Sequence, residues 1–311
     1  MTRTFKDYFL VTLKGMGMGA ADVVPGVSGG TIAFITGIYE ELINTIKSIQ
    51  PSLLKDFKNG GFKAIWYKVN APFLVALLLG IGISIASLSR IILFLLQNYP
   101  IPVWAFFFGL ILASAYLVAA EIDEWNLPVI IATFVGTSIA YTITIISPAE
   151  TPTDLWFIFI CGAIAICAMI LPGISGSFIL LLMGKYEYIF TSLKEFNLAV
   201  IITFALGCVT GILSFSHILS WMFKKYKNVT IALLAGFMIG SLNKVWPWKE
   251  VLLKVTINGK EKILQEGNLL PAKFTEVTGI PNQLWLAIVL FILGVILSIS
   301  IERLGNNQKN Q

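Results

Sequence analysis

Two copies of a Pro-Gly break contain the residues of this chain best suited to bind a ligand. Pro25-Gly26-Val27-Ser28-Gly29-Gly30 returns 147 positions later as Pro172-Gly173-Ile174-Ser175-Gly176-Ser177. Proline ends a helix and glycine lets the backbone turn, so the next helix begins with unpaired N–H groups that attract anions. The predicted phosphate-binding residues are Ser28, Gly29, Gly30, Thr31, Ser175, Gly176 and Ser177. The alternative is that each motif only interrupts a helix.

Arginine and glutamate residues near these motifs extend the predicted site. Arg90 lies inside the apolar run 72–96, where a charge needs a partner, and its guanidinium suits phosphate. A static salt bridge with Asp22 is the alternative role for Arg90. Glu40 and Glu187 end the two copies of a Gly-x-Tyr-Glu sequence and could accept protons during coupling or gating. They could equally be interfacial residues that face head groups or water.

Asp22 and His217 are two further candidates for coupling. Asp22 precedes the first break, and the aligned residue in the second copy is the uncharged Met169. It could take part in proton transfer or form an ion pair with Lys14 or Arg90. His217 aligns with Arg90 and is the only histidine, so it could change protonation near neutral pH. The alternative for His217 is a packed, hydrogen-bonded side chain.

Composition predicts a membrane protein. Of the 311 residues 57% are hydrophobic and 13% are charged, with mean hydropathy +0.83, whereas soluble domains contain about 25% charged residues. We therefore expect one membrane domain over 1–311. Lys14 and Asp22 interrupt the first apolar stretch, so we expect it to be retained rather than cleaved as a signal peptide.

Cysteine spacing and charge distribution exclude several classes of site. The cysteines lie in apolar runs without metal-ligand spacing, so neither a disulfide framework nor a metal site is expected; they are Cys161, Cys167 and Cys208. The net charge of +5 comes without a clustered basic face. It predicts contact with membrane lipids and no nucleic-acid partner.

The duplication predicts the architecture. We expect an all-α polytopic membrane protein made of two halves, each a re-entrant helical hairpin followed by three transmembrane helices; full crossings in place of the hairpins are the alternative. Repeat one spans 8–148, with a hairpin at 8–47 and transmembrane helices at 72–97, 102–120 and 127–147. Repeat two spans 154–303, with a hairpin at 155–191 and transmembrane helices at 198–223, 229–245 and 284–302. Because three crossings is an odd number, the second half is inverted relative to the first.

Two insertions interrupt this repeat. Beyond the motifs the offset shortens to 127, from Gly80 to Gly207, which indicates extra loop residues at 50–71 in the first copy. The polar stretch 246–283 is predicted to be an external loop. Asn258-Gly259 lies there between alternating residues and predicts a small β-hairpin.

Charge asymmetry between loops predicts the orientation. Lys and Arg gather before residue 15, at 47–68 and at 224–227, whereas the loops 97–103 and 147–154 have none. The positive-inside rule then places both termini in the cytoplasm. Two loops fit this orientation less well, because the acidic loop 121–125 falls inside and Lys185 and Lys194 fall outside.

The two motif regions resemble a known family. GAADVVPGVSGGTIAFITGIYEELI and AMILPGISGSFILLLMGKYEYIF resemble the PopT-like polyprenyl-phosphate transporter family, formerly a bacterial membrane domain of unknown function. The resemblance implies a plasma-membrane translocase that returns undecaprenyl phosphate from the outer to the inner leaflet, for carrier lipid recycling in cell wall biogenesis. Because an inside-negative potential opposes inward movement of an anion, we expect a proton or another ion as the coupling species. No cofactor is expected, and a homodimer stays open. By position, the phosphate-handling residues would be those of the two breaks together with Arg90.

Other functions and an asymmetry between the halves are also considered. A small-anion transporter or channel could use the same architecture. An intramembrane lipid-phosphate enzyme would need a nucleophile with a base, or a metal cluster, and we expect neither, so no catalytic residue is assigned. In the second motif Ser177 replaces Gly30 and Phe178 replaces Thr31. We therefore expect the first half to hold the phosphate more strongly.

Overall fold

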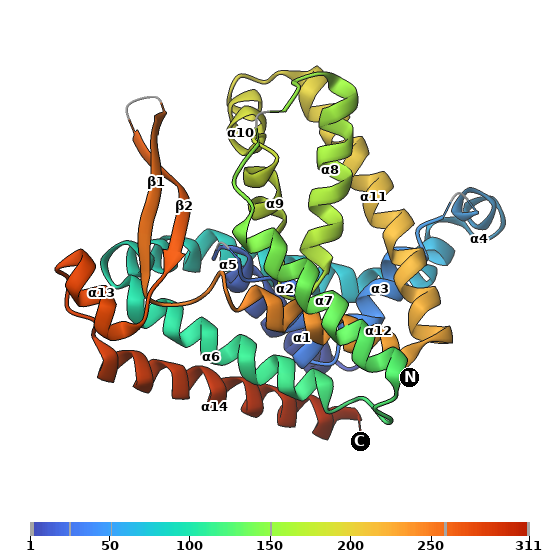
Figure 1. Cartoon of the computed structure of the whole chain (residues 1–311). Coiled ribbons are helices and arrows are strands. Elements are labelled where there is room, and N and C mark those ends of the chain that lie inside the picture. The colour runs from blue at the N-terminus through green and yellow to red at the C-terminus, as the bar shows by residue number, and fades with distance from the viewer. Residues whose placement is uncertain (1–2, 25, 51, 150, 258–259, 310–311) are drawn as a thin grey trace.

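The computed structural model describes residues 3–24, 26–50, 52–149, 151–257 and 260–309. Helices dominate these residues, and one two-stranded sheet projects from them (Figure 1). In chain order the elements are α1 Phe5–Asp22, α2 Gly29–Ile35, α3 Tyr39–Lys47, α4 Leu53–Lys68, α5 Ala71–Asn98, α6 Pro100–Ala119, α7 Leu127–Ile145, α8 Leu155–Ile170, α9 Gly176–Leu182, α10 Tyr186–Lys194, α11 Leu198–Lys225, α12 Lys227–Ser241, β1 Lys249–Ile257, β2 Lys260–Asn268, α13 Pro271–Thr278 and α14 Leu284–Lys309.

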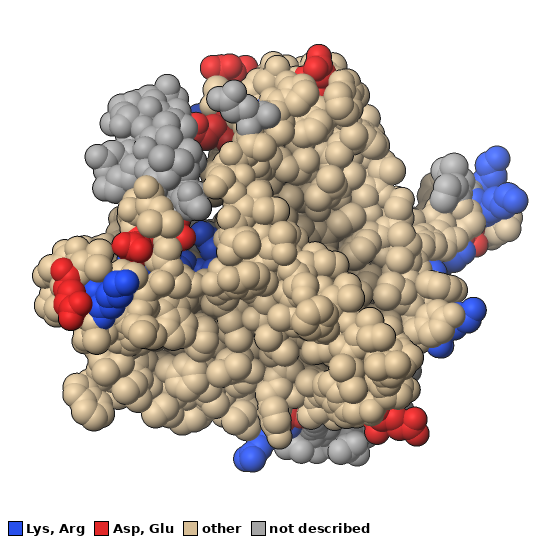
Figure 2. All heavy atoms as spheres, in the orientation of Figure 1, with Lys and Arg blue, Asp and Glu red and all other residues tan. Residues whose placement is uncertain are grey.

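Within the described residues, five helices are long and apolar enough to cross a membrane: α5, α6, α7, α11 and α14 over 284–303. The crossing expected at 229–245 corresponds to α12, which has 15 residues and ends at Ser241. At 1.5 Å per residue this helix is about 22 Å long, less than the ~30 Å hydrocarbon core. Figure 2 shows charged atoms around the edges of one face and a broad uncharged area between them, as a membrane protein requires.

The two insertions differ in how well they were predicted. The extra stretch at 50–71 was expected to be a loop, but it contains α4, whose helical geometry is interrupted at Gly61. The hairpin at 246–283 is confirmed, because β1 and β2 pair antiparallel and Ile257 lies opposite Lys260. The turn residues that predicted it, Asn258-Gly259, lie outside the described residues.

Both Pro-Gly motifs interrupt a helix in the same way. Gly26 has φ 86° and Gly173 has φ 88°, a left-handed conformation that side chains disfavour. A helix of 7 residues follows each break, α2 in the first half and α9 in the second. The backbone therefore repeats at these positions as well as the sequence.

The first long helix of each half packs closely against the helix that precedes the break. Gly15 of α1 faces Leu77 of α5, and Gly80 faces Thr12. In the second half Gly162 of α8 faces Phe204 of α11, at positions shifted by the same 147 and 127 residues. Glycine lets the two backbones approach, which is how helices pack in a membrane.

The remaining long helices pair across the two halves. Gly109 of α6 lies against Phe291 of α14, and Gly236 of α12 lies against Thr133 of α7. Figure 1 shows α6 and α14 side by side, running in the same direction. The second long helix of each half thus packs against the third long helix of the other, so the halves share one interior.

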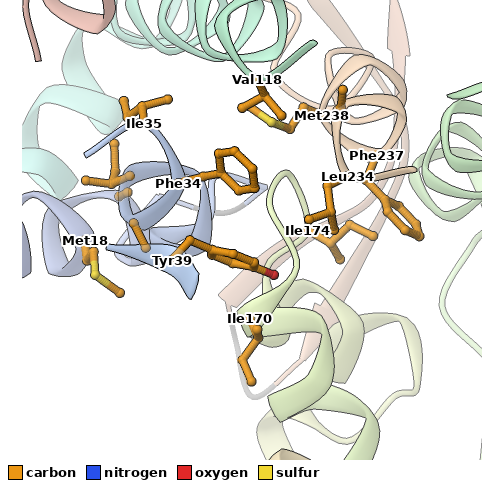
Figure 3. Packing of buried hydrophobic residues seen from close by; sticks show 14 of the residues in the cluster. Met18, Phe34, Ile35, Tyr39, Val118, Ile170, Ile174, Leu234, Phe237 and Met238 are labelled. Carbon is orange, nitrogen blue, oxygen red and sulfur yellow. The ribbon is translucent and has the colours of Figure 1, made fainter. Parts of the chain in front are cut away.

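The centre of this interior is apolar and lies between the two breaks. Phe34 of α2, Ile170 and Ile174 beside the second break, and Leu234 and Met238 of α12 belong to one buried cluster (Figure 3). Elements from both halves meet there, α2 from the first and α12 from the second. The polar atoms of the breaks are therefore surrounded by hydrocarbon and need partners inside the protein.

Replacing Gly80 by alanine should destabilise the fold. The new Cβ would overlap the Thr12 carbonyl oxygen, and overpacking of this kind costs about 1–3 kcal/mol. Gly82, two residues on, has open space around it, so Gly82→Ala adds helix propensity without a clash. In detergent, Gly80→Ala should melt below the wild type and Gly82→Ala at or above it. Equal melting temperatures would show that close packing of α1 on α5 is not required.

Candidate functional site

The two breaks touch each other through hydrogen bonds. The Ser28 hydroxyl lies 3.2 Å from the carbonyl oxygen of Met169 and 3.0 Å from that of Leu171, as a donor. The Gly173 N–H donates to Thr31 Oγ1 over 3.1 Å. Ser28 and Thr31 are fully buried. The structure thus brings two predicted phosphate-binding residues together with the backbone of the other half.

Protein groups already occupy the N-terminus of α2. The Gly29 N–H donates to the Asp22 carboxylate over 2.7 Å, and the Gly30 N–H donates to Ser28 Oγ over 3.1 Å. The Thr31 N–H donates to the Ser28 carbonyl oxygen. A helix N-terminus favours negative charge, and here Asp22 provides it from within the chain. The carboxylate stands where the sequence predicted a ligand anion.

The N-terminus of α9 has a different environment. Ser175 makes no capping hydrogen bond to the helix, and its Oγ instead lies 2.7 Å from Ser177 Oγ. Ser175 and Gly176 are buried, whereas Ser177 is exposed. The residue aligned with Asp22 is Met169, which has no charge to offer. The expectation that the first half holds phosphate more strongly is not favoured by this geometry, since only the first helix end has its own anion.

Arg90 lies on α5, a helix that packs against α1, α4 and α6. Its side chain is exposed, and it forms no ion pair with any residue in the described ranges. The predicted salt bridge with Asp22 is therefore not made in this structure. Because the guanidinium is exposed, it remains available to a ligand.

The other predicted coupling residues lie apart from the breaks. Glu40 is exposed on α3 and lines a cavity of about 320 Å³ together with Lys224 and Lys227. Glu187 is half-buried on α10. His217 Nδ1 lies 2.7 Å from the Leu213 carbonyl oxygen in the preceding turn of α11, which agrees with the packed alternative.

A cluster of charges that the sequence did not reveal lies at the base of the hairpin. Lys244 Nζ and Lys249 Nζ lie 3.0 Å and 3.3 Å from the same oxygen, Oε2 of Glu266. The Lys249 ammonium also donates to the Lys244 carbonyl oxygen and sits 4.7 Å from the centre of the Trp104 ring. The pairing depends on how β2 folds back onto β1, so spacing along the chain gives no signal for it.

Burial changes the acid–base behaviour of this cluster. Desolvation lowers the pKa of Lys249 to about 8, the Glu266 carboxylate opposes this shift, and Lys244 adds to it. For Glu266, burial alone would raise the pKa, but the Lys249 and Lys244 ammonium groups outweigh it and hold the pKa below its ordinary value. The three groups therefore form one coupled unit.

Apolar helices of membrane-spanning length, joined around two polar helix breaks, define a polytopic helical membrane protein. The chain belongs to the VCA0040-like family, described as undecaprenyl phosphate translocase-like, which matches residues 18–263. This confirms the family indicated by the two motifs.

Two relatives extend the comparison. A polyprenyl-phosphate transporter of Vibrio cholerae serotype O1 is 48% identical over 298 residues, covering 96% of this chain and 97% of the relative. A polyprenyl-phosphate transporter of Staphylococcus aureus is 30% identical over 253 residues, covering 76% of this chain and 85% of the relative. No solved structure matches the chain.

Removing the Thr31 hydroxyl should weaken the junction between the breaks. Thr31→Val keeps the shape but leaves the buried Gly173 N–H without its acceptor, which costs about 1–3 kcal/mol. Thr31→Ser retains the hydroxyl and is the matched control. We expect the melting temperatures of the wild type and Thr31→Ser in detergent to be higher than that of Thr31→Val. If Thr31→Val melts with Thr31→Ser, the hydrogen bond does not hold the breaks together.

Lys249 should titrate near pH 8. An acylating reagent that reacts only with the neutral amine, followed by mass spectrometry, should give a midpoint near 8 in the folded protein against the ordinary 10.5 in the denatured chain. Between these values the unfolded chain holds the extra proton, so the contribution of Lys249 to stability rises with pH. Glu266→Gln should lower the midpoint further, because the carboxylate that favours the ammonium is lost. An unchanged midpoint in Glu266→Gln would contradict the coupling.

Proposed function

We propose that this chain moves undecaprenyl phosphate, or a related polyprenyl phosphate, from the outer to the inner leaflet of the bacterial plasma membrane. The observation that carries the proposal is the junction of two polar helix breaks inside an apolar helical interior. Both relatives are named polyprenyl-phosphate transporters, which supports the substrate. The role would be to return carrier lipid for another round of envelope synthesis.

In this proposal the segments around the breaks are re-entrant hairpins, at 8–47 and 155–191. Contacts between the two ends of each segment support it. Arg3, before α1, forms an ion pair with Glu41 of α3 through bonds of 2.5 and 2.6 Å. Thr151, before α8, donates to the Met183 carbonyl oxygen after α9. A segment whose ends are tied together enters and leaves on one side of the membrane.

The two halves, 8–148 and 154–303, form an inverted repeat in this proposal. Helix α12 corresponds to α6 by sequence, and the order of its contacts with α7 bears on its direction. Gly236 faces Thr133 and Gly240 faces Thr137, so α12 and α7 run parallel. Figure 1 shows α7 running back along α6, which supports opposite directions for α6 and α12. With basic loops inside, both termini lie in the cytoplasm and 246–283 lies outside.

The polyprenyl tail stays in lipid while the phosphate passes the breaks. Hydroxyl and N–H groups of the two breaks then replace water around the phosphate, and Arg90 adds a cationic partner. The groups belong to Ser28, Gly29, Gly30, Thr31, Ser175, Gly176 and Ser177. Contact with Ser28 and Thr31 requires the junction between the breaks to part, because both side chains are engaged there. Phosphate would displace the Asp22 carboxylate from the N-terminus of α2.

Protons or another ion drive the movement in this proposal. An inside-negative membrane potential opposes the inward passage of an anion, so a compensating positive charge is needed. Protonation of Asp22 would both supply that charge and free the Gly29 N–H for the phosphate. Glu40, Glu187 and His217 are further positions at which a coupling proton could bind.

The test is a reconstitution assay with vesicles that contain polyprenyl phosphate in both leaflets. An added phosphatase reports how fast inner-leaflet lipid becomes accessible. Vesicles with the wild-type protein should exchange the lipid between leaflets faster than vesicles without protein. The double variant Ser28→Ala, Ser175→Ala and the single variant Arg90→Ala should each exchange it at least tenfold more slowly than the wild type. Equal rates in wild-type and empty vesicles would reject lipid transport. Flux of a small anion without lipid exchange would favour a channel instead.

Asp22→Asn tests coupling in the same vesicles. The amide still accepts a hydrogen bond from Gly29 but cannot take up a proton, so transport should lose its dependence on external pH. An unchanged dependence in Asp22→Asn would exclude Asp22 as the coupling group.

A further inference from the structure

A cavity of about 520 Å³ lies between α9, the end of α7 and the base of the hairpin. Its polar wall contains Lys244, Lys249 and Glu266, and its aromatic walls include Trp104 and Phe178. Figure 2 shows basic atoms recessed into the surface beside the hairpin. Phe178 belongs to the second motif, but Lys244, Lys249 and Glu266 lie outside both motifs and were not among the predicted site residues.

The charges in the cavity do not balance. Lys244 and Lys249 share a single carboxylate, so the cluster keeps one excess positive charge. The Lys249 side chain is only 9% exposed, and a buried ammonium needs anionic partners. Lysine binds phosphate as a compact point charge with several donors. The site is therefore suited to an anion that adds to the cluster or competes with Glu266.

Another part of the cavity lining is apolar. Tyr141, Ile145 and Ile146, at the end of α7, line it and are about half exposed. A ligand with a charged head and a hydrocarbon chain would place its head at the lysines and its chain across these side chains. A hydrophilic phosphate ester would leave this apolar wall uncovered.

Lys244 connects the cavity with both breaks. Its Nζ lies 4.9 Å from the centre of the Phe178 ring, in the first turn of α9. Its aliphatic stem packs against the first break, since a Cβ on Gly26 would lie 2.8 Å from Lys244 Cγ. A head group bound at Lys244 is thus beside the junction where the proposed passage begins.

We propose that this cavity binds the phosphate head of an isoprenoid lipid before it reaches the breaks, with Lys244 and Lys249 as the phosphate-binding residues and Glu266 as the carboxylate that the phosphate displaces. The proposal rests on the proposed function for its ligand and adds a binding site, a role for the hairpin and a point of access. Glu266 keeps the two ammonium groups paired while the site is empty of lipid.

The test measures binding of a water-soluble short-chain isoprenyl monophosphate to purified protein by calorimetry. Lys244→Met and Lys249→Met keep the apolar stems and should each weaken binding about tenfold or more, the loss expected for a charge-assisted hydrogen bond. Glu266→Gln removes the competing carboxylate and, measured well below the Lys249 midpoint so that both ammonium groups stay charged, should tighten binding or leave it unchanged. Lys273→Met, an exposed lysine of α13 in the same insertion, is the control and should bind as the wild type does.

The sign of the Glu266→Gln effect separates the proposal from a purely structural ion pair. If the lysines and Glu266 only stabilise the hairpin, Glu266→Gln should weaken binding as the lysine variants do, and the proposal fails. Lys249→Gln, which removes the charge but keeps a polar side chain, replaces Lys249→Met if the latter does not fold. Inorganic phosphate and the isoprenyl alcohol should both bind more weakly than the monophosphate. Equal affinity for inorganic phosphate would reject a lipid site in favour of a simple anion site.

Failure of this inference can be distinguished from failure of the proposed function. If wild-type vesicles exchange polyprenyl phosphate and both lysine variants bind and exchange it at the wild-type level, the cavity is not the binding site but transport stands. If the monophosphate binds in a lysine-dependent way and no exchange occurs, the cavity stands as a lipid-phosphate site and transport is rejected.

Discussion

A helix that breaks inside a membrane leaves backbone polar groups with no water to pair them, and this constraint organises the rest of the chain. The two breaks satisfy each other. Ser28 donates to carbonyl oxygens beside the second break, and Thr31 accepts from Gly173. These partners come from the other half in each case, so the two breaks stabilise each other.

The duplication provides similar backbones with unequal chemistry. Gly26 and Gly173 adopt nearly the same backbone conformation. The Asp22 carboxylate accepts a hydrogen bond at the helix end after the first break, whereas the aligned residue at the second break, Met169, has no charged group. A transported anion would therefore meet one helix end that must release its own carboxylate and one that has none. In the proposed function, such inequality would give the two halves different affinities for the phosphate.

Packing across the halves ties this polar junction to the membrane helices. The pairs α6–α14 and α7–α12 each join one half to the other through glycine contacts, and the hairpin is inserted between α12 and α14. Lys244 lies three residues after the end of α12 and its stem packs against Gly26, so this side chain joins the base of the hairpin to the first break. The hairpin is therefore connected to the interior rather than an independent appendage.

The sequence was enough to predict the membrane class, the family, the repeated breaks and the hairpin, because apolar runs, Pro-Gly and Asn-Gly are local patterns. It did not predict α4 or the early end of α12, because where a helix begins and ends depends on how it packs against the rest of the chain. The folded structure was needed to show that Asp22 accepts a hydrogen bond from Gly29, and that Lys244 and Lys249 share Glu266, 22 and 17 residues away. These partners are set by how the chain folds back on itself, and a carboxylate or ammonium carries no local sign of which opposite charge it will meet.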